Sequence, residues 1–469
     1  MTTTTIDGSH GEGGGQILRN ACAYAAILRK NVRIVNIRAG RKKPGLRPQH
    51  LVGLRLLAAA SGGCLVEGNH VGSTEILFLV DNNNETNNNN ASNSNSNSST
   101  TKNSNTTNNF HGNNNNGRTK NREYIGDTQT AGSVCLLLQT VLPFALLRNK
   151  DHDNNDDESL RFILKGGTDA DFAPPIDYFR YVFLPTLRNC CGLGGRESGI
   201  NNEEEEENKQ VINLEMIGRG FFPRGGGEVR VTVRRPSLTT LPLPPIRLTE
   251  RGKIIGITVR AFSAGNCPPS MAKTLSTTVQ NIISSNPSYN AVPTTVILSE
   301  ESETSSSNDT TTSATTGGKK RGNKRPRPAS SGCGVLIVAE TDTGCLFGGS
   351  ATGSPKIPLI ETARAATKEV VDAMDGGGCV DDYLQDQLIL YMALADGVSE
   401  LVTNSFTLHT RTAIWLASRM VPSARFEVTK LQVAEDTSSI DDDGDMGGRI
   451  PVRHRIRCHG IGLCPSRGT

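Results

Sequence analysis

The alternation of short β-branched runs with longer apolar segments, joined by glycine-rich turns, limits the fold of this chain more than any other feature. β-branched runs favour strands, and apolar residues at every third or fourth position favour helices. Strands and helices that alternate along one chain predict an α/β (α+β) architecture. We expect strands at 32–37, 161–164, 229–233 and 254–259, and helices at 16–28, 48–60, 131–142, 178–188, 361–374, 381–394 and 410–419.

A short motif occurs twice within this pattern. Ile37-Arg-Ala-Gly40 and Leu164-Lys-Gly-Gly167 each precede a proline and an expected helix. The similarity favours two copies of one β/α module.

Two long polar tracts interrupt the pattern. Residues 82–117 are mostly Asn, Ser and Thr, and residues 302–331 are rich in Ser and Thr and then basic. Such segments bury too little apolar surface to offset their chain entropy, so we expect both to be disordered. The basic cluster around Lys319, Lys320 and Arg321 fits a nuclear import signal, a loose RNA contact or a solvated loop.

The overall charge is nearly balanced, with 50 Lys and Arg against 47 Asp and Glu. Any basic surface must therefore be a local patch rather than a property of the whole molecule. No apolar run reaches the roughly 18 residues that a membrane helix needs, and the chain begins without a signal-peptide pattern. Eleven scattered cysteines fit reduced thiols. We expect a soluble protein of the nucleus, the cytoplasm or both.

Two neighbouring segments are candidates for phosphate binding. Gly11–Arg19 holds three consecutive glycines before a helix, and such a turn either presents free N–H groups to an anion or is simply structural. The next segment is a loop that contains Gly40, Pro44 and Gly45 and suits either bidentate phosphate contacts or solvation. Its basic residues are Arg38, Arg41, Lys42, Lys43 and Arg47.

Two further segments are candidates for nucleotide chemistry. Tyr383, Asp386 and Gln387 share a face of one expected helix, where they suit either a nucleotide or water. His409 opens the next expected helix, whose dipole disfavours a charged imidazole. A neutral imidazole is a competent nucleophile towards phosphorus, although a lone histidine is more often an ordinary polar residue.

Together these segments resemble the RNA 3′-terminal phosphate cyclase family. The resemblance runs in family order across nearly the whole chain, and the two polar tracts and two acidic loops, at 203–207 and 441–445, fall between the matching stretches. These stretches are 11–19 (GEGGGQILR), 37–51 (IRAGRKKPGLRPQHL), 131–139 (AGSVCLLLQ), 164–178 (LKGGTDADFAPPIDY), 220–229 (GFFPRGGGEV), 381–388 (DDYLQDQL) and the LHT around His409.

The resemblance implies a fold of repeated β/α modules, each a four-stranded sheet with two helices, plus a smaller inserted β/α domain. We place the core domain at 1–250 and 377–469 and the insert at 251–376. It also implies ATP-dependent conversion of an RNA 3′-phosphate into a 2′,3′-cyclic phosphate, through a histidine–AMP and an RNA-ppA intermediate.

Site residues follow from the matching positions. The resemblance makes His409 the AMP carrier, and Glu12 would lie near a divalent ion, Mg or Mn. Arg19, Arg38, Arg41 and Gln49 would contact phosphate or RNA. The ATP or AMP pocket would include Gln16, Gln139, Pro174, Tyr383, Asp386 and Gln387.

Two alternatives stay open. A non-cyclase relative that acts in pre-ribosomal RNA processing and ribosome biogenesis shares the fold, but it lacks the nucleophilic histidine and the intact glycine-rich turn. This sequence keeps both. A non-enzymatic RNA-binding module is the more distant alternative, and such a module has no need of a nucleotide pocket.

Overall fold

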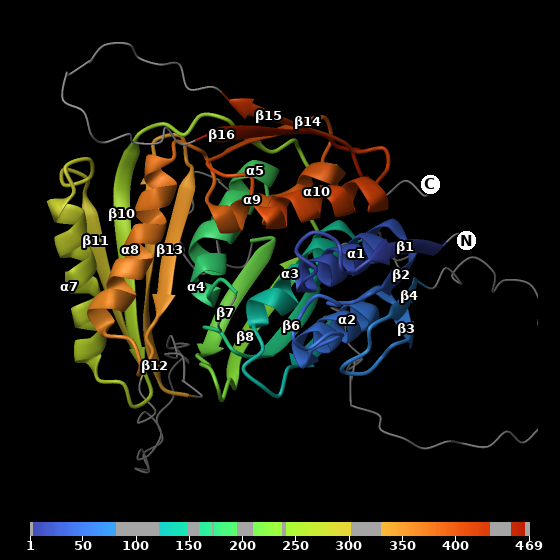
Figure 1. The fold of residues 1–469 in the computed structure, drawn as a ribbon, viewed down its shortest axis with the longest axis horizontal. Helices are drawn as coiled ribbons and strands as arrows, with labels where there is room; N and C mark the ends of the chain where they lie inside the picture. The colour runs from blue at the N-terminus through green and yellow to red at the C-terminus, as the bar shows by residue number, and fades with distance from the viewer. Residues whose placement is uncertain are drawn as a thin grey trace, which may run out of the picture.

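The structure is a computed structural model. It describes residues 3–80, 122–148, 159–170, 173–194, 210–236, 241–301, 330–431 and 452–464. Four sheets of four strands, each with helices packed on it, make up the described part of the chain (Figure 1). The predicted α/β (α+β) class is therefore confirmed.

Three of the sheets share one topology. In each, the first strand pairs in parallel with the second, the second pairs antiparallel with the fourth, and the fourth pairs antiparallel with the third. Each set has one helical segment after its first strand and another after its second, and in the second set the latter segment is divided into several pieces. The predicted repetition of β/α modules is thus present in the fold.

The first module contains β1 (Thr3–Asp7), α1 (Gly15–Leu28), β2 (Asn31–Val35), α2 (Pro48–Ser61), β3 (Gly63–Glu67) and β4 (Ile76–Val80). The second contains β5 (Arg122–Asp127), α3 (Val134–Leu147), β6 (Ser159–Gly166), α4 (Ile176–Tyr178), α5 (Leu184–Cys191), β7 (Ile212–Gly218) and β8 (Gly227–Arg234). The third contains β9 (Arg247–Leu248), α9 (Asp382–Leu394), β14 (Val398–Thr403), α10 (Leu408–Met420), β15 (Arg425–Leu431) and β16 (Arg453–His459).

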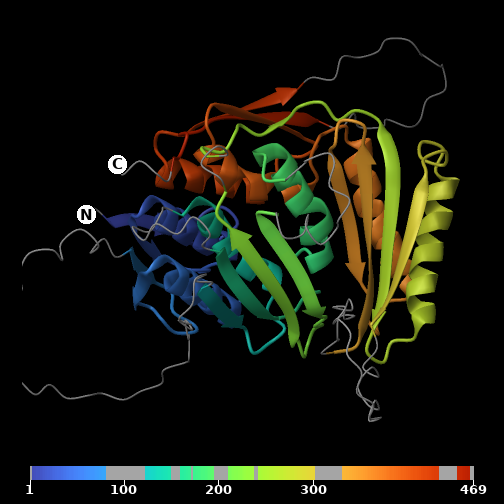
Figure 2. The ribbon, with the colours of Figure 1, turned by 180° about the vertical axis from the view of Figure 1, so that it is seen from behind.

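The fourth sheet follows a different order, β11-β10-β12-β13. Its segment of the chain falls between β9 and α9, and it stands at one end of the molecule with α7 outermost (Figures 1 and 2). The predicted domain boundaries stay a prediction. The segment contains β10 (Ile254–Ala264), α7 (Pro269–Ser285), β11 (Thr294–Glu301), β12 (Gly332–Thr341), β13 (Leu346–Thr352) and α8 (Leu359–Asp375).

The helices of the three modules meet at the centre of the molecule. α1 contacts α2, α3 and α10, while α9 contacts α3 and α10. α3 is apolar almost all round and is buried on nearly every side, as expected for a helix between layers. One continuous apolar core therefore joins the three modules, and a second lies within the fourth sheet and its helices.

Local signals explain several helix ends. α2 begins at Pro48, whose missing N–H costs nothing in the first turn, and ends before Gly62 in a left-handed conformation. α3 begins at Val134, three residues later than expected, because the Ser133 hydroxyl caps it by accepting from the Leu136 N–H at 3.4 Å. It continues past the expected end at residue 142, through Pro143.

The helix expected at 178–188 is interrupted by a π-helical turn at Phe179–Phe183. Pro185 lies in the first turn of α5 and has no N–H for a bond to the carbonyl four residues back. The Leu184 N–H instead bonds to the Phe179 carbonyl, five residues back. The proline thus accounts for the wider turn.

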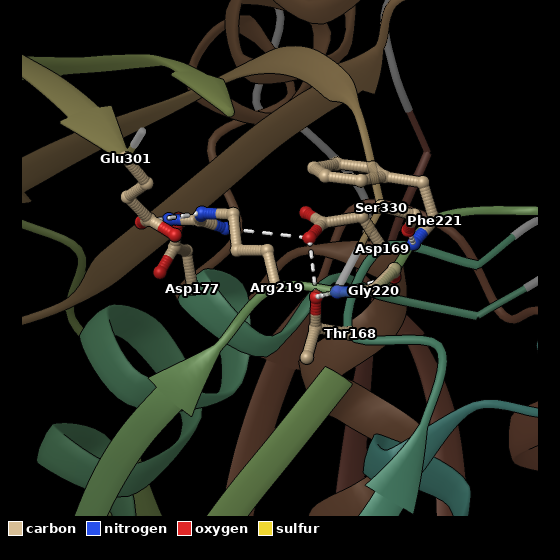
Figure 3. A network of polar contacts seen from close by, with 8 residues as sticks. All are labelled: Thr168, Asp169, Asp177, Arg219, Gly220, Phe221, Glu301 and Ser330. Atoms are coloured by element: carbon tan, nitrogen blue, oxygen red, sulfur yellow. Dashed lines mark hydrogen bonds and ion pairs between the residues drawn. The ribbon is translucent and has the colours of Figure 1, made fainter. Parts of the chain in front are cut away.

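A buried ionic cluster ties the fourth sheet to the second module (Figure 3). Arg219, just after β7, donates to Asp177 at 2.7 Å, to Glu301 at 2.9 Å and to Asp169 at 3.3 Å. Its guanidinium also lies 3.6 Å from the ring centre of Phe262 in β10. Burial lowers the pKa of Arg219, but the three carboxylates outweigh it and raise that pKa overall.

Several predictions fall outside the described residues. They are the disorder of 82–117, almost all of the tract at 302–331 with its basic cluster, and the acidic loops at 203–207 and 441–445. The nuclear or cytoplasmic location stays a prediction as well. Within the described ranges, no helix has both the length and the apolar content needed to cross a bilayer.

Candidate functional site

A pocket of about 560 Å³ opens where the three modules and the fourth sheet meet. The residues that line it come from α1, α3, α8, α9, β13, the segment before α4, and α10 with the loop before it. Seven of the predicted site residues are among them: Arg19, Gln139, Pro174, Tyr383, Asp386, Gln387 and His409.

The start of α9 forms one wall of the pocket. Asp381 caps the helix by accepting from the Tyr383 and Leu384 N–H groups at 3.1 and 2.8 Å. It also accepts from the Tyr178 hydroxyl at 2.6 Å and from the Gly348 N–H at 2.9 Å, so this cap fixes α9 to both neighbouring units. Burial raises the pKa of Asp381 to about 6 in spite of these donors.

The capped helix places Tyr383, Asp386 and Gln387 on the pocket, as their spacing allowed. The Tyr383 ring is 40 % exposed and meets the Tyr178 ring edge-on, with ring centres 5.7 Å apart. Gln387 donates to the Tyr383 carbonyl at 2.6 Å, which fixes the side chain. Its amide oxygen is shielded from solvent and has no hydrogen-bond partner among the described residues.

Asp386 joins this wall to α1. The Gln16 side chain donates to its carboxylate at 2.5 Å. Burial raises the pKa of Asp386 to about 6, while the nearby charges of His409 and Arg19 and the Gln16 bond act in the opposite direction. Burial disfavours the charge of Arg19 as well, and it lowers the pKa of that guanidinium to about 10. Gln16 also lines a small space beside the main pocket.

His409 is the second residue of α10 and therefore lies inside the helix, whereas we expected the helix to begin at residue 410. Thr407 caps α10, and its hydroxyl accepts from the Thr410 N–H at 3.1 Å. The Thr410 hydroxyl donates to the buried Gln385 of α9 at 2.8 Å, which anchors this helix end. The His409 side chain is 55 % exposed beside the pocket.

Glu12 approaches His409 from the first module. Its Oε2 lies 3.3 Å from His409 Nδ1, and its Oε1 accepts from Arg41 at 2.6 Å. The Glu12 N–H donates to the Thr412 hydroxyl of α10 at 3.2 Å. A Cβ on Gly14 would lie 2.2 Å from the Glu12 carboxylate, so the glycine leaves room for it. The Glu12 carboxylate thus lies against Gly14 at the start of α1, where the sequence allowed either an anion site or a structural turn.

The basic loop at residues 38–47 lies next to Glu12, which pairs with Arg41. Arg38 is partly buried, and burial together with the charges of Arg41 and Arg47 lowers its pKa. His50 is buried beside Arg19, Arg38 and Arg47 and accepts from the Arg47 N–H at 3.2 Å. Burial, reinforced by those three arginines, lowers the pKa of His50 to about 3. The loop is therefore a shaped cluster of cations around a neutral histidine.

The structure separates the predicted residues into two groups. One group lines the main pocket, whereas Glu12, Gln16, Arg38, Arg41 and Gln49 do not. Gln49 accepts from the Ser133 N–H at 3.3 Å, so it contacts the start of α3. A helix-capping position was the local signal available for Asp381 and for Thr407. Sequence reasoning missed these two and several other residues that line the pocket or support it. They are Asp381, Asp382, Glu369, Asp372, Ser405, Thr407, His50, Gln385 and Thr412.

The arrangement suits transfer of a phosphorus-containing group. An exposed imidazole lies at the rim of a pocket large enough for a nucleotide, with a carboxylate at its Nδ1 and several arginines nearby. A nucleophile, a nucleotide pocket and cations for phosphate charge are the components that such a transfer requires.

Comparison with known proteins identifies relatives along nearly the whole chain. The family model of RNA 3′-terminal phosphate cyclase matches residues 10–428. An RNA 3′-terminal phosphate cyclase of Drosophila melanogaster is 31% identical over 427 residues, which cover 90% of this chain and 92% of the relative. One of Staphylothermus marinus is 30% identical, covering 99% and 100%. A "probable" one of Dictyostelium discoideum is 30% identical, covering 94% and 82%. The chain therefore belongs to the RNA 3′-terminal phosphate cyclase family, a family of ligase-type enzymes.

Proposed function

We propose that this protein is an ATP-dependent cyclase that converts an RNA 3′-terminal phosphate into a 2′,3′-cyclic phosphate. The observation that carries the proposal is the pocket that His409 lines together with five of the six residues expected to hold the adenylate. These are Gln139, Pro174, Tyr383, Asp386 and Gln387, which come from segments far apart in the sequence. Membership of the family supports the same reaction.

The contact between Glu12 and His409 favours one nitrogen as the nucleophile. A carboxylate beside Nδ1 stabilises the tautomer that carries its proton there, which leaves the lone pair on Nε2 free. In the first step, Nε2 attacks the α-phosphorus of ATP. A phosphorus–nitrogen bond forms, the bond to the β-phosphate oxygen breaks, and pyrophosphate leaves.

Two transfers follow from this histidine–AMP intermediate. An oxygen of the RNA 3′-phosphate attacks the phosphorus of the AMP group, His409 leaves, and RNA-ppA forms. The 2′-hydroxyl oxygen then attacks the RNA phosphorus and loses its proton. AMP leaves, and the 2′,3′-cyclic phosphate remains. The covalent intermediate divides one difficult displacement into easier ones.

The cations and amides have assigned roles in this scheme. Arg19, Arg38 and Arg41 stabilise the charge on the phosphates in transfer, because each lies near Glu12, whose carboxylate contacts His409. Gln16 fixes Asp386 at the nucleotide. Gln49 is assigned to the RNA or phosphate side, outside the nucleotide pocket.

A divalent ion, Mg or Mn, fits beside Glu12 if the triphosphate supplies most of its ligands. The described residues contain no group of three or more His, Cys, Asp or Glu side chains placed to hold a metal. Mg²⁺ is often bound through a single carboxylate together with substrate phosphates and water. When bound, the ion would neutralise phosphate charge, and Glu12 would be its protein ligand.

Incubation with ATP labelled at the α-phosphate tests the proposal. We expect acid-labile label to remain on the denatured protein, and to be absent from His409→Ala. His70→Ala, at an exposed histidine of the first module, is the matched control and should label like the wild type. Absence of label with every divalent metal would overturn the mechanism, and label on His409→Ala would overturn the assignment of the nucleophile.

RNA that ends in a 3′-phosphate tests the later steps. The labelled protein should lose AMP on mixing, and the RNA end should become cyclic. A protein that takes up no label and leaves the RNA unchanged would instead fit the non-cyclase relatives that act in ribosome biogenesis.

Glu12→Ala tests the metal assignment separately. We expect adenylylation to need more divalent ion, because the one carboxylate placed to bind it is gone. Its midpoint in a metal titration is the measurement. An unchanged midpoint would remove Glu12 from the metal site.

A further inference from the structure

Beside the candidate site, the ring of Trp415 stacks on the ring of His10. Trp415 is the single tryptophan of the chain and lies on α10. The two ring centres are 3.8 Å apart, and the ring planes differ by 14°. Trp415 is partly buried against the main core, whereas His10 is exposed. The stack therefore consists of an exposed ring packed flat on a partly buried one.

The stack is continuous with the candidate site. His10 lies two residues before Glu12, and Trp415 lies on the same side of α10 as Thr412. A Cβ on Gly11 would lie 2.4 Å from the Thr412 hydroxyl, so this loop and this helix are in direct contact. Trp415 lies six positions after His409 on the helix, which corresponds to a rise of about 9 Å. That rise is roughly the length of two to three stacked bases.

A cation lies next to the stack. The guanidinium carbon of Arg419 is 5.5 Å from the Trp415 ring centre. Arg419 is exposed and has no carboxylate partner among the residues that the structure describes. The His10 ring likewise makes no hydrogen bond within those residues. Aromatic rings with an unpaired arginine are the features that bind single-stranded nucleic acid.

We infer that the His10–Trp415 stack binds a base of single-stranded RNA a short distance upstream of the 3′-terminal phosphate, and that Arg419 contacts the RNA backbone beyond it. The inference rests on the proposed function, since the RNA end must lie at His409. The base stacks on the open face of His10, and Trp415 supports the imidazole from the other side. Stacking of this kind tolerates every base.

Trp415 itself reports on the contact. The whole chain is titrated, without ATP, with a short single-stranded RNA that ends in a 3′-phosphate. We expect a saturable change in tryptophan emission, and no change with inorganic triphosphate. Oligonucleotides that lack one base at a time should locate the contact at one of the last few nucleotides. Bound RNA that leaves the emission unchanged would overturn the inference.

Variants measured by anisotropy of a labelled RNA test the residues. His10→Ala should raise the Kd by about tenfold, because base stacking on aromatic side chains has roughly that effect. His10→Phe should restore tight binding, since it restores a flat ring. Equal binding by His10→Ala and the wild type, or failure of the His10→Phe rescue, would overturn the inference.

Arg419→Ala should weaken binding and reduce its dependence on salt concentration, because one phosphate contact is lost. Arg364→Ala is the matched control, at an exposed helical arginine paired with Glu361. Equal losses in the two variants would overturn the role of Arg419. RNA binding is measured without ATP, so a protein that fails to adenylylate but passes these tests contradicts only the proposed function.

Discussion

Two regions of the molecule place carboxylates in buried or enclosed surroundings. They differ in the groups that hold the carboxylates, which are a cation in one region and neutral hydrogen-bond donors in the other. In the cluster around Arg219, one fixed cation lies within 3.3 Å of Asp169, Asp177 and Glu301. None of these four side chains is more than 6% exposed. In the pocket, Asp386 and Asp381 are held by neutral donors, and burial raises each pKa to about 6.

The difference shows which polar groups hold parts of the fold together and which remain available to bind a ligand. The Arg219 guanidinium offsets part of the charge of its three carboxylates and joins the second module to the fourth sheet (Figure 3). The amide oxygens of Gln387, in the pocket, and of Gln16, beside it, have no hydrogen-bond partner within the described ranges. An unmet buried acceptor costs about 1–3 kcal/mol, which a ligand that donates to it would recover.

The largest expected effect in this comparison is on stability, through Arg219→Met. The change removes the cation and leaves three buried carboxylates, so we expect the free energy of unfolding to fall by about 3–5 kcal/mol. Urea denaturation is the measurement. Arg230→Met is the matched control, because Arg230 pairs with Glu228 at the surface and its loss should cost at most about 1 kcal/mol.

A second substitution sharpens this test. Adding Glu301→Gln to Arg219→Met removes one of the repelling charges and should restore part of the lost stability. If Arg219→Met is as stable as the control, or the double variant is less stable than Arg219→Met, the cluster does not join the two units as described.

The next effect concerns His50, where the site buries a basic group in its neutral form. Its folded pKa of about 3 lies below the ordinary 6.5, so as pH falls the unfolded chain binds the proton first. The contribution of neutral His50 to the stability of the folded protein is complete above pH 6.5 and is lost as the pH falls towards 3. The loss is about 2 kcal/mol at about pH 5.

Unfolding free energies at pH 7 and pH 5 check this prediction in the wild type and in His50→Asn. Asparagine keeps an acceptor for the Arg47 N–H but does not titrate. The wild type should lose about 2 kcal/mol more than the variant over this interval. Parallel losses in the two proteins would show that His50 is not held neutral.

The smallest effect on stability is expected for Thr412→Val, at the hydrogen-bonded contact between Glu12 and α10. The Thr412 hydroxyl accepts from the Glu12 N–H and donates to the Leu408 carbonyl. Its loss should cost about 1 kcal/mol and slow adenylylation, because Glu12 is less firmly held beside His409. Thr186→Val removes a similar buried helix bond but no loop contact, so it should leave adenylylation unchanged. Equal adenylylation rates in the two variants would contradict this role.

Local signals in the sequence predicted much of the fold. Pro48 and Gly62 limit α2 to within one residue of its bounds in the structure, and the apolar run of α3 was recognised as a helix. The errors occurred where a single side chain changes a helix end or its hydrogen bonding, as at Ser133 and Pro185. The strand β9 was missed because two residues have no periodicity to detect, and longer elements such as α7 and β12 were not predicted either.

The candidate site divides in the same way. The sequence by itself determined the residue types, the helix faces and the family resemblance, because these depend on neighbours a few positions apart. Only the tertiary structure brought Glu12 to Thr412, Gln16 to Asp386 and Arg219 to Glu301, pairs separated by 400, 370 and 82 residues. Such contacts leave no periodic signal in the chain, since they depend on how whole modules pack together.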